Sequence, residues 1–225
     1  MNIIRPKLPP LPPKMSSLPI DERGYPVPYF VAWVDGKPDH RIADATKMPK
    51  AVKLGLCWLC GQKLGRFKSF CIGPMCSITR TISEPPSHLE CVRYAAQACP
   101  FMTRPRAKRR ESNLPGDIIY PAGEGLKRNP GVVCVWTTLK STPHTVDGQL
   151  LFSIGDAEHT EWYAEGRPAT RAEVDESINS GLHLLRGPAD AQDAVEPGAG
   201  AVAELQRRLV KETAWLDRQQ WPIVV

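Results

Sequence analysis

The chain has 225 residues, of which 42% are hydrophobic and 24% charged, a composition typical of a globular protein. No apolar run reaches the roughly 18–20 residues of a membrane helix, and the N-terminus lacks the apolar core of a secretion signal. We therefore expect a cytoplasmic protein with no membrane partner. Lys and Arg outnumber Asp and Glu by 21 to 10 over residues 1–128, a net charge of +11, whereas residues 129–225 carry 8 and 14, a net charge of −6. A polyanion would meet the first part first, although opposite charges could equally dock the two parts together.

Residues 1–20 are expected to form a Pro-rich, disordered tail. Five prolines lie between Arg5 and Lys14, a density typical of an extended polyproline conformation. Lys7, Pro10 and Pro13 match the basic-x-x-P-x-x-P spacing that SH3 grooves accept. The alternative is that translation starts at Met15 and that the tail is an upstream extension.

Residues 21–112 are predicted to form a Cys-rich module. Its first part should contain a strand at Val27–Val34, a hairpin turn at Asp35-Gly36 and a return strand at His40–Ala43. A short helix is expected over Thr46–Leu54.

Six of the seven cysteines lie within residues 57–99, and this clustering favours a metal site. An odd number of cysteines and the lack of an export signal favour reduced thiols over a disulfide framework. Cys57 and Cys60 are separated by two residues and followed by Gly61, the pattern of a zinc knuckle. In such a knuckle, a tight turn points both sulfurs at one ion, and glycine adopts a backbone conformation that a side chain would resist.

His88 and Cys91 are the best candidates for the other two ligands. Ser87 and Glu90 form a capping-box pattern, which predicts a helix running to about Ala98. Positions 88 and 91 then share one face of the first helical turn. The helix N-terminus also favours a thiolate, because its partial positive charge stabilises the anionic sulfur.

A knuckle, a hairpin and a helix whose first turn supplies the last two ligands are the parts of a treble-clef zinc finger, and this segment resembles that family. The resemblance places the ligands at Cys57, Cys60, His88 and Cys91, with Zn²⁺ as the cofactor. Leu64–Thr81 has the apolar and Gly/Pro content of the intervening hairpin. Four protein ligands leave no open position for water, so the metal would have a structural role.

Two other cysteines compete for the third and fourth ligand positions. Cys76 follows a Gly-Pro turn that could present a thiolate, and Cys99 precedes a proline at the end of the expected helix. Cys71 is expected in a strand and Cys134 in the core.

The wider pattern of residues 23–101 is also similar to that of uncharacterised actinobacterial and phage-type proteins. The shared pieces are RGYPVP at 23–28, CWLCG at 57–61, GPMC at 73–76, EPPSH at 84–88 and CPF at 99–101, and GRPAT at 166–170 fits the same pattern. The resemblance implies a single folded unit and names no activity.

Residues 113–130 are expected to form a loop or linker, and residues 131–225 a small α+β region. Val132–Thr138, Leu150–Ile154 and Glu161–Ala164 are predicted to be three strands of one small sheet.

Two helices should complete the chain. Thr170 and Glu173 form a capping box that starts the first helix, and Gly187-Pro188 should end it. Its apolar stripe comprises Val174, Ile178, Leu182 and Leu185. Residues 189–200 are expected to be a linker, and residues 201–219 the last helix. The predicted fold class is therefore α+β: a Cys-rich, treble-clef-like zinc module followed by a small antiparallel sheet with two helices.

A basic segment is the strongest indication of a partner. Five cations within seven residues could neutralise several phosphates with release of counterions; they are Arg104, Arg106, Lys108, Arg109 and Arg110. Such a run can also be merely solvated.

Catalytic interpretations carry less support from the residues. Cys76 could be a nucleophile activated by Arg80 or His88, and a treble clef can carry HNH-type nuclease chemistry, but no paired His precedes the expected hairpin. An anion could sit near Arg167 at a helix N-terminus. A second metal could be held by Asp156, Glu158, His159 and Glu161, which more simply form a polar turn.

The sequence thus predicts a non-enzymatic, zinc-stabilised binding module with nucleic acid as its expected partner. The alternative is a phage or mobile-element accessory protein that binds another protein through its acidic half or its terminal helix. An HNH-like nuclease or a Cys-dependent enzyme is the third hypothesis.

Overall fold

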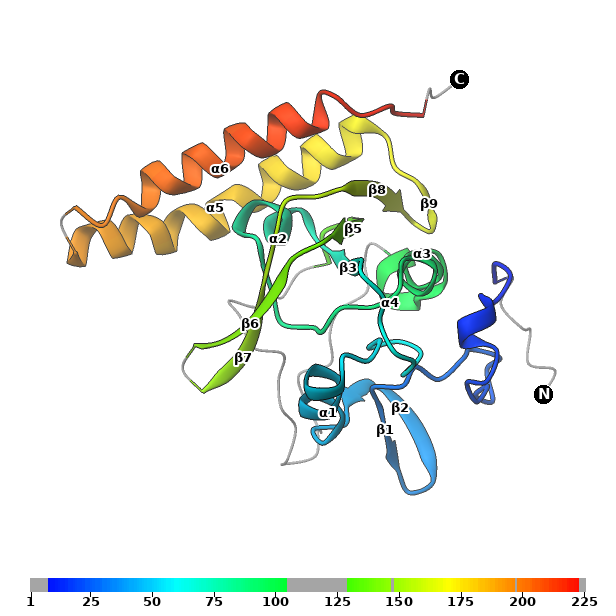
Figure 1. Ribbon diagram of the computed structural model, residues 1–225. Coiled ribbons are helices and arrows are strands. Elements are labelled where there is room, and N and C mark those ends of the chain that lie inside the picture. The colour runs from blue at the N-terminus through cyan, green and yellow to red at the C-terminus, as the bar shows by residue number, and fades with distance from the viewer. Residues whose placement is uncertain (1–7, 105–128, 147, 197, 223–225) are drawn as a thin grey trace.

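The computed structural model describes residues 8–104, 129–146, 148–196 and 198–222, and it has an α+β fold with small antiparallel sheets. A four-stranded sheet lies at its centre, with the order β3-β5-β8-β9. A helical hairpin covers one face of this sheet, and a shorter helix covers the other (Figure 1). The predicted fold class is confirmed at the level of α+β.

The N-terminal segment is ordered where a disordered tail was predicted. Residues 13–15 form a single 3-10 turn, and Met15 is only 2% exposed. Met15 packs in one cluster with three cysteines and with Tyr94, while Leu8 and Leu11 pack around that cluster. The prediction of disorder is therefore wrong for residues 8–20, because the apolar side chains between the prolines pack against this buried cluster.

A two-stranded hairpin and a helix follow. Strand β1 (Val31–Val34) pairs with β2 (Lys37–Ala43), and the turn between them has positive φ at both Asp35 and Gly36, as expected for an Asp-Gly hairpin. Helix α1 (Lys47–Leu54) ends at Gly55, which adopts the left-handed conformation. The hairpin turn and the helix are confirmed, although β1 begins four residues later than predicted.

The hairpin predicted over Leu64–Thr81 does not form. The segment contains β3 (Lys68–Ile72), helix α2 (Pro74–Thr79) and β4 (Thr81–Ile82), and the two strands belong to different sheets. Proline at the first helical position has a φ that suits a helix start, so the Gly-Pro pair begins a helix here instead of a turn between strands.

The chain then enters α3 (Leu89–Ala98) and α4 (Pro100–Thr103). Helix α3 lies against the central sheet, where Val92 and Ala96 pack against Val133 and Val135. This contact fixes the start of α3 relative to the sheet.

The central sheet combines strands from both predicted regions of the chain. Strand β5 (Val132–Thr138) is buried along its whole length between β3 and β8 (His159–Ala164), and β9 (Arg167–Pro168) extends the far edge. Alternate side chains of β5 serve two cores: Cys134 and Trp136 face the helical hairpin, whereas Val133 and Val135 face α3.

A second sheet has the order β4-β7-β6. Strand β7 (Gln149–Ile154) pairs with β6 (Ser141–Val146) on one side and with β4 on the other. The three strands predicted in this half all exist, but the single sheet predicted for them is wrong, because β7 joins the second sheet.

The C-terminal helices form an antiparallel hairpin (Figure 1). Helix α5 (Arg171–Val195) begins with the predicted capping box, in which Thr170 and Glu173 exchange hydrogen bonds. It does not end at Gly187-Pro188, and much of the predicted linker is helical. Asp193, near the end of α5, accepts hydrogen bonds from the first two main-chain N–H groups of α6 (Ala201–Leu216), so the extension of α5 caps α6.

Candidate metal centre

The first two candidate ligands lie on a tight loop between α1 and β3. The loop is closed by a bridge between Leu56 and Lys63 and by a hydrogen bond from the N–H of Cys57 to the carbonyl of Gln62, 2.8 Å. The N–H of Gly61 donates to the carbonyl of Cys57, 2.9 Å, and Gly61 has φ of +74°. The N–H of Cys60 points at the sulfur of Cys57, 3.4 Å away. This loop has the geometry expected of a knuckle.

The other two candidate ligands lie at the start of α3. His88 is the N-cap residue and Cys91 lies in the first turn. The predicted Ser87–Glu90 capping box is wrong. Ser87 exchanges two main-chain hydrogen bonds with Ser69 of β3. Glu90 pairs with Lys14 at 2.5 Å instead of completing a capping box. The start of α3 is thus anchored to the central sheet.

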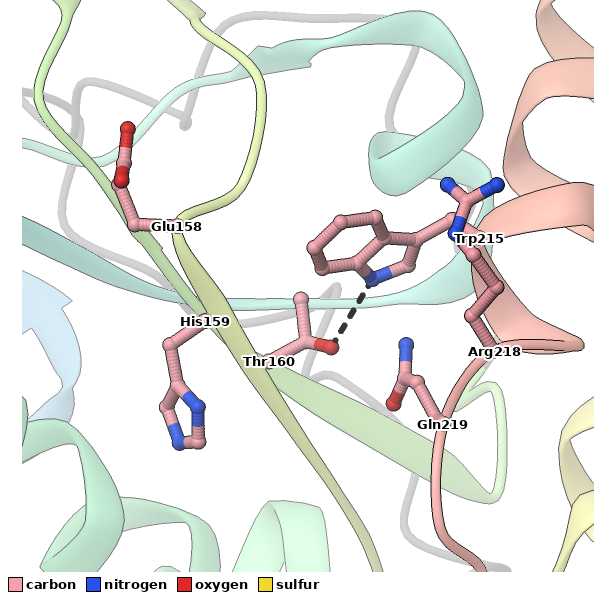
Figure 2. A pocket seen from close by; sticks show the side chains of 6 residues that line it. All are labelled: Glu158, His159, Thr160, Trp215, Arg218 and Gln219. Carbon is pink, nitrogen blue, oxygen red and sulfur yellow. Dashed lines mark hydrogen bonds between the residues drawn. The ribbon is translucent and has the colours of Figure 1, made fainter.

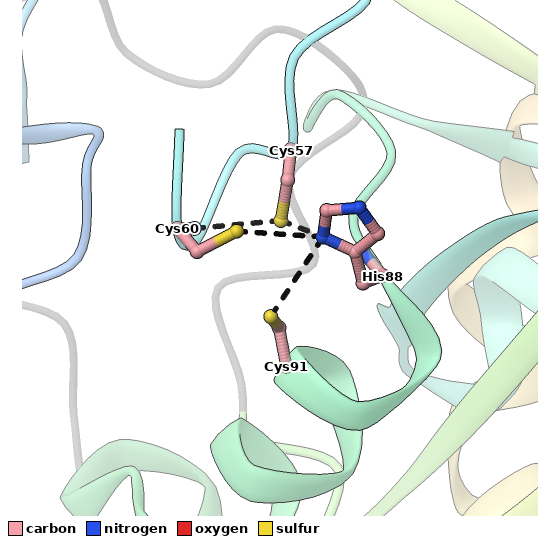
Figure 3. A group of neighbouring side chains, drawn as sticks. All are labelled: Cys57, Cys60, His88 and Cys91. Atoms are coloured by element: carbon pink, nitrogen blue, oxygen red, sulfur yellow. Dashed lines mark hydrogen bonds between the residues drawn. The ribbon is translucent and has the colours of Figure 1, made fainter. Parts of the chain in front are cut away.

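Four soft ligand atoms converge between the loop and the helix (Figure 3). The sulfurs of Cys57, Cys60 and Cys91 and a nitrogen of His88 all lie within 4.8 Å of one another. Nδ1 of His88 is 3.4 Å from Sγ of Cys60 and 4.0 Å from Sγ of Cys91. A tetrahedron with metal–sulfur bonds of about 2.3 Å and a metal–nitrogen bond of about 2.0 Å has edges of roughly 3.5–3.8 Å. The cluster could therefore hold one metal ion with little rearrangement.

Hydrogen bonds from neighbouring groups orient the candidate ligands. Nε2 of His88 is 3.0 Å from the carbonyl oxygen of Lys63, which makes Nε2 the protonated nitrogen and leaves Nδ1 free to bind a metal. The N–H of His88 also points at Sγ of Cys57, 3.4 Å away. Lys63 was not recognised from the sequence, because a main-chain carbonyl carries no residue-type signal.

The three thiols have strongly divergent acidities. A hydrogen bond from Cys91, supported by the N–H groups of Cys60 and His88, lowers the pKa of Cys57 to about 4. Burial and the charge of Cys57 raise the pKa of Cys60 to about 11, and the hydrogen bond to Cys57 together with burial raises the pKa of Cys91. Three thiolates this close repel one another, and a bound cation is the usual means of stabilising them.

The competing cysteines lie elsewhere. Cys76 is in α2, Cys99 caps the end of α3, and Cys71 is in β3 with its sulfur 3.4 Å from that of Met102. Cys134 is fully buried in β5, as expected for a core residue. Across residues 8–104, 129–146, 148–196 and 198–222, the quartet is the one group of three or more Cys, His, Asp or Glu side chains placed to share an ion.

Met15 and Lys14 are contributions that the sequence did not indicate. Met15 packs with Cys57, Cys60 and Cys91, and Lys14 pairs with Glu90 beside them. No local pattern could have predicted these contacts, because more than 40 residues separate the N-terminal segment from the knuckle.

The other predicted site residues are mostly engaged or not described. Arg104 is exposed, whereas Arg106, Lys108, Arg109 and Arg110 lie outside the described residues. The guanidinium of Arg167 pairs with Glu173, 2.5 Å, so it is not available to the anion proposed from the sequence.

The acidic group before β8 is also occupied by protein partners. Asp156 pairs with Lys211 at 2.6 Å, and Glu161 accepts hydrogen bonds from His159, Arg93 and Tyr163. Burial alone would raise the pKa of Glu161, but these hydrogen bonds lower it to about 2. These carboxylates therefore act as ion-pair partners.

A shallow hollow lies between the start of β8 and the end of α6 (Figure 2). Its volume is about 230 Å³. The indole N–H of Trp215 donates to the hydroxyl of Thr160, 3.1 Å, and the guanidinium of Arg218 lies 5.6 Å from the centre of the Trp215 ring. Trp215 therefore forms a hydrogen bond with β8 and packs near the guanidinium of Arg218.

Comparison with known proteins finds no family model that matches the chain, no similar curated protein and no similar solved structure. The treble-clef resemblance therefore stays a prediction: the knuckle and the helical pair are present, but the hairpin between them is not. None of the helices in the described part of the chain is long and apolar enough to span a membrane.

Proposed function

We propose that the chain is a non-enzymatic binding module stabilised by one Zn²⁺ ion at Cys57, Cys60, His88 and Cys91. The observation that carries the proposal is the convergence of three sulfurs and one imidazole nitrogen within 4.8 Å. Thiolate and imidazole ligands in a compact tetrahedral set favour zinc over the harder divalent cations. None of the seven cysteines, all of which lie in the described part of the chain, forms a disulfide, which is consistent with a reducing compartment such as the cytoplasm.

The proposed role of the ion is structural. Four protein ligands fill a tetrahedral shell, so no coordination position is left for a reacting water. The ligands come from two places that the fold must hold together, the loop after α1 and the start of α3. Zinc bound there contributes its binding free energy to folding.

Metal analysis of the purified protein tests the zinc site. We expect one equivalent of zinc in the wild type and in Cys76→Ala, and a large loss of zinc in Cys57→Ser and Cys91→Ser. Replacing zinc with Co²⁺ should give the absorption of a tetrahedral thiolate complex. Full zinc content in both ligand variants would refute the proposal.

Nucleic acid is the proposed partner. The support is the run of five cations over residues 104–110, which begins directly after α4 at the exposed Arg104. Replacing all five with Gln should weaken binding to oligonucleotides and flatten its dependence on salt, by about 0.7 in log–log slope for each single-strand phosphate that is no longer neutralised. An unchanged slope would show that these five cations do not neutralise phosphates. A wild-type chain that binds no oligonucleotide would favour the competing proposal, in which the chain binds another protein through its acidic half.

A further inference from the structure

A second basic surface lies around the candidate metal centre, in a different segment of the sequence from residues 104–110. No Asp or Glu occurs between Asp44 and Glu84, whereas six Lys or Arg occur between residues 45 and 79. Helix α1, the knuckle and the start of β3 together carry this stretch. We call its solvent-accessible part the α1–knuckle surface, which comprises Lys50, Lys53, Lys63, Arg66, Phe67 and Lys68.

Hydrogen bonds hold the two halves of this surface together. The ammonium of Lys63 donates to the carbonyl of Leu54 at the end of α1, and the N–H of Leu64 donates to the carbonyl of Gly55, 2.9 Å. The end of α1 therefore touches the base of the knuckle. Lys50 and Lys53 are three residues apart and lie on one side of α1.

The cations of this surface are not neutralised by acidic side chains within the part of the chain that the structure describes. None of the ion pairs there involves Lys50, Lys53 or Lys63, nor Arg66 or Lys68. By contrast, cations on the helical hairpin are paired, as Arg186 is with Asp190 and Arg207 with Glu204. An unneutralised, concentrated positive surface is complementary to a polyanion.

An exposed aromatic ring lies within this basic surface. Phe67 is 51% exposed, although a phenyl ring is normally buried. The guanidinium of Arg66 lies 5.9 Å from the centre of the Phe67 ring. A ring flanked by cations offers a stacking platform for a base and neutralising groups for the adjoining phosphates, which is the usual chemistry of single-strand binding.

We propose that the α1–knuckle surface binds single-stranded nucleic acid, with Phe67 stacking on a base and Lys50, Lys53 and Arg66 neutralising phosphates. The inference rests on the proposed nucleic-acid function and assigns it a site distinct from residues 104–110. The metal centre would then support binding, because an ion bound to Cys57 and Cys60 would hold the knuckle in place. The knuckle presents Lys63 and the residues after it.

The test is fluorescence anisotropy of labelled DNA and RNA oligonucleotides with the zinc-loaded full chain at several salt concentrations. The variant Lys50→Gln/Lys53→Gln/Arg66→Gln removes three cations that take part in none of the ion pairs among the described residues. We expect it to bind at least tenfold more weakly and to lower the log–log salt slope by about 2, at about 0.7 per phosphate. Phe67→Ala should weaken single-strand binding about fivefold or more, whereas Phe67→Trp should retain it.

The matched control is Arg186→Gln/Arg207→Gln/Lys211→Gln, which makes the same change in net charge on the helical hairpin. It should bind almost as the wild type does. Equal weakening by this control and by the α1–knuckle variant would overturn the inference, because only net charge would then matter. Equal circular dichroism and zinc content of all variants exclude unfolding.

The variants also distinguish failure of this inference from failure of the proposed function. If neutralising residues 104–110 abolishes binding while the α1–knuckle variant and Phe67→Ala bind as the wild type does, this inference is overturned and the proposed function stands. The reverse pattern supports it and moves the binding site away from residues 104–110. A wild-type chain that binds no oligonucleotide, or that binds only phosphatidylserine vesicles, overturns both. Binding of duplex DNA that is insensitive to Phe67→Ala overturns the single-strand assignment.

Discussion

At the residue scale, Gly61 shows how one backbone position supports the candidate metal centre. Its φ of +74° suits glycine, and a Cβ built there would lie 2.7 Å from Cδ2 of Tyr29. The main-chain N–H of Tyr29 donates to the carbonyl of Leu59 inside the knuckle, which fixes the backbone of Tyr29. Cβ of Tyr29 lies 3.4 Å from the added Cβ, so rotation of the ring would relieve only part of the contact. Glycine is therefore required at position 61 for two reasons, conformation and space.

Gly61→Ala should lower the free energy of unfolding by more than Gly36→Ala does. Both glycines have φ of +74°, but a Cβ at Gly36 meets nothing within 4 Å. Gly36→Ala should therefore cost only the strain of the left-handed conformation, about 1–2 kcal/mol, and the clash at Gly61 should add to that strain. Chemical denaturation of the zinc-loaded proteins measures the difference; equal losses would contradict the role assigned to Tyr29.

A buried ion pair lies on the other side of the molecule. Glu212 of α6 has a side chain only 1% exposed and pairs with Arg80 at 3.2 Å, and the guanidinium of Arg80 lies 4.0 Å from the ring centre of Trp136. Burial raises the pKa of Glu212, while the charges of Arg80 and Lys211 and a hydrogen bond from Ser77 oppose that rise. The folded state therefore favours the protonated form of Glu212 over the ionised form.

This raised pKa has a defined effect on stability. The stabilisation associated with Glu212 is complete below its unfolded pKa of about 4.5 and is lost as pH rises through the higher folded pKa. The difference in unfolding free energy between Glu212→Gln and the wild type should therefore become more favourable to the variant as pH increases.

Glu204→Gln is the control of opposite sign. Hydrogen bonds from Arg208 and Arg207 lower the pKa of Glu204, so its stabilisation is present above the unfolded pKa and lost as pH falls. The variant should therefore compare worse with the wild type as pH increases. Denaturation curves at matched pH values measure both differences; parallel pH trends in the two variants would contradict the assignment for Glu212.

At the scale of elements, the candidate metal ligands connect the knuckle to the start of α3, and Leu59 and Leu64 add apolar contacts with the clusters that contain α3 residues. The knuckle follows α1, whereas α3 packs on the central sheet through Val92 and Ala96. Outside the quartet, the links between them include the N–H of Trp58 with the carbonyl of Pro86, 3.1 Å, and the pair between Lys14 and Glu90. A bound ion would reinforce these contacts by joining both elements at one centre.

Removal of the proposed zinc ion should open the knuckle and leave the helical hairpin intact. In Cys57→Ser, hydrogen exchange should accelerate over residues 8–20, over residues 55–64 and in the first turn of α3, because their shared cluster loses its centre. Protection of β5 and α5 should remain close to that of the Cys76→Ala control. Uniform acceleration across all elements would show that the metal supports the whole fold equally.

The sequence predicted best what depends on short spacing. The Cys57–Cys60–His88–Cys91 cluster was predicted because each pair lies within four residues, and the Asp35-Gly36 turn and the Thr170–Glu173 capping box are equally local. The sequence failed where distant contacts decide. Pairing of β3 with β5 joins segments about 60 residues apart, and α5 continues through Pro188 because its last turns pack with and cap α6.

At the scale of the whole molecule, the central sheet joins the two predicted regions. Phe70 and Ile72 of β3 are each 2% exposed, and they share one core with Trp136 of β5 and with Leu216 of α6. The Cys-rich region therefore completes its core with residues from the second half of the chain.

A fragment of residues 8–104 should consequently bind zinc without acquiring the native core. All four ligands are present in it, but β3 loses its partner strand, and Phe70 and Ile72 lose the surface that covers them. We expect poorly dispersed amide resonances and no protection of β3 in an NMR spectrum of the zinc-loaded fragment. A well-dispersed spectrum with a protected β3 would instead show that the Cys-rich region is an independent domain.

The position of Met15 has a kinetic consequence. Its side chain is 2% exposed and packs with the three clustered cysteines, so we expect a chelator to reach an ion bound there only after the N-terminal segment lifts away. Capture of the ion by a chelator should then be limited by that opening and be independent of chelator concentration at high excess. Met15→Ala should accelerate metal release while the number of ions bound at equilibrium stays at one, which would make the N-terminal segment a determinant of how long each ion resides in the protein.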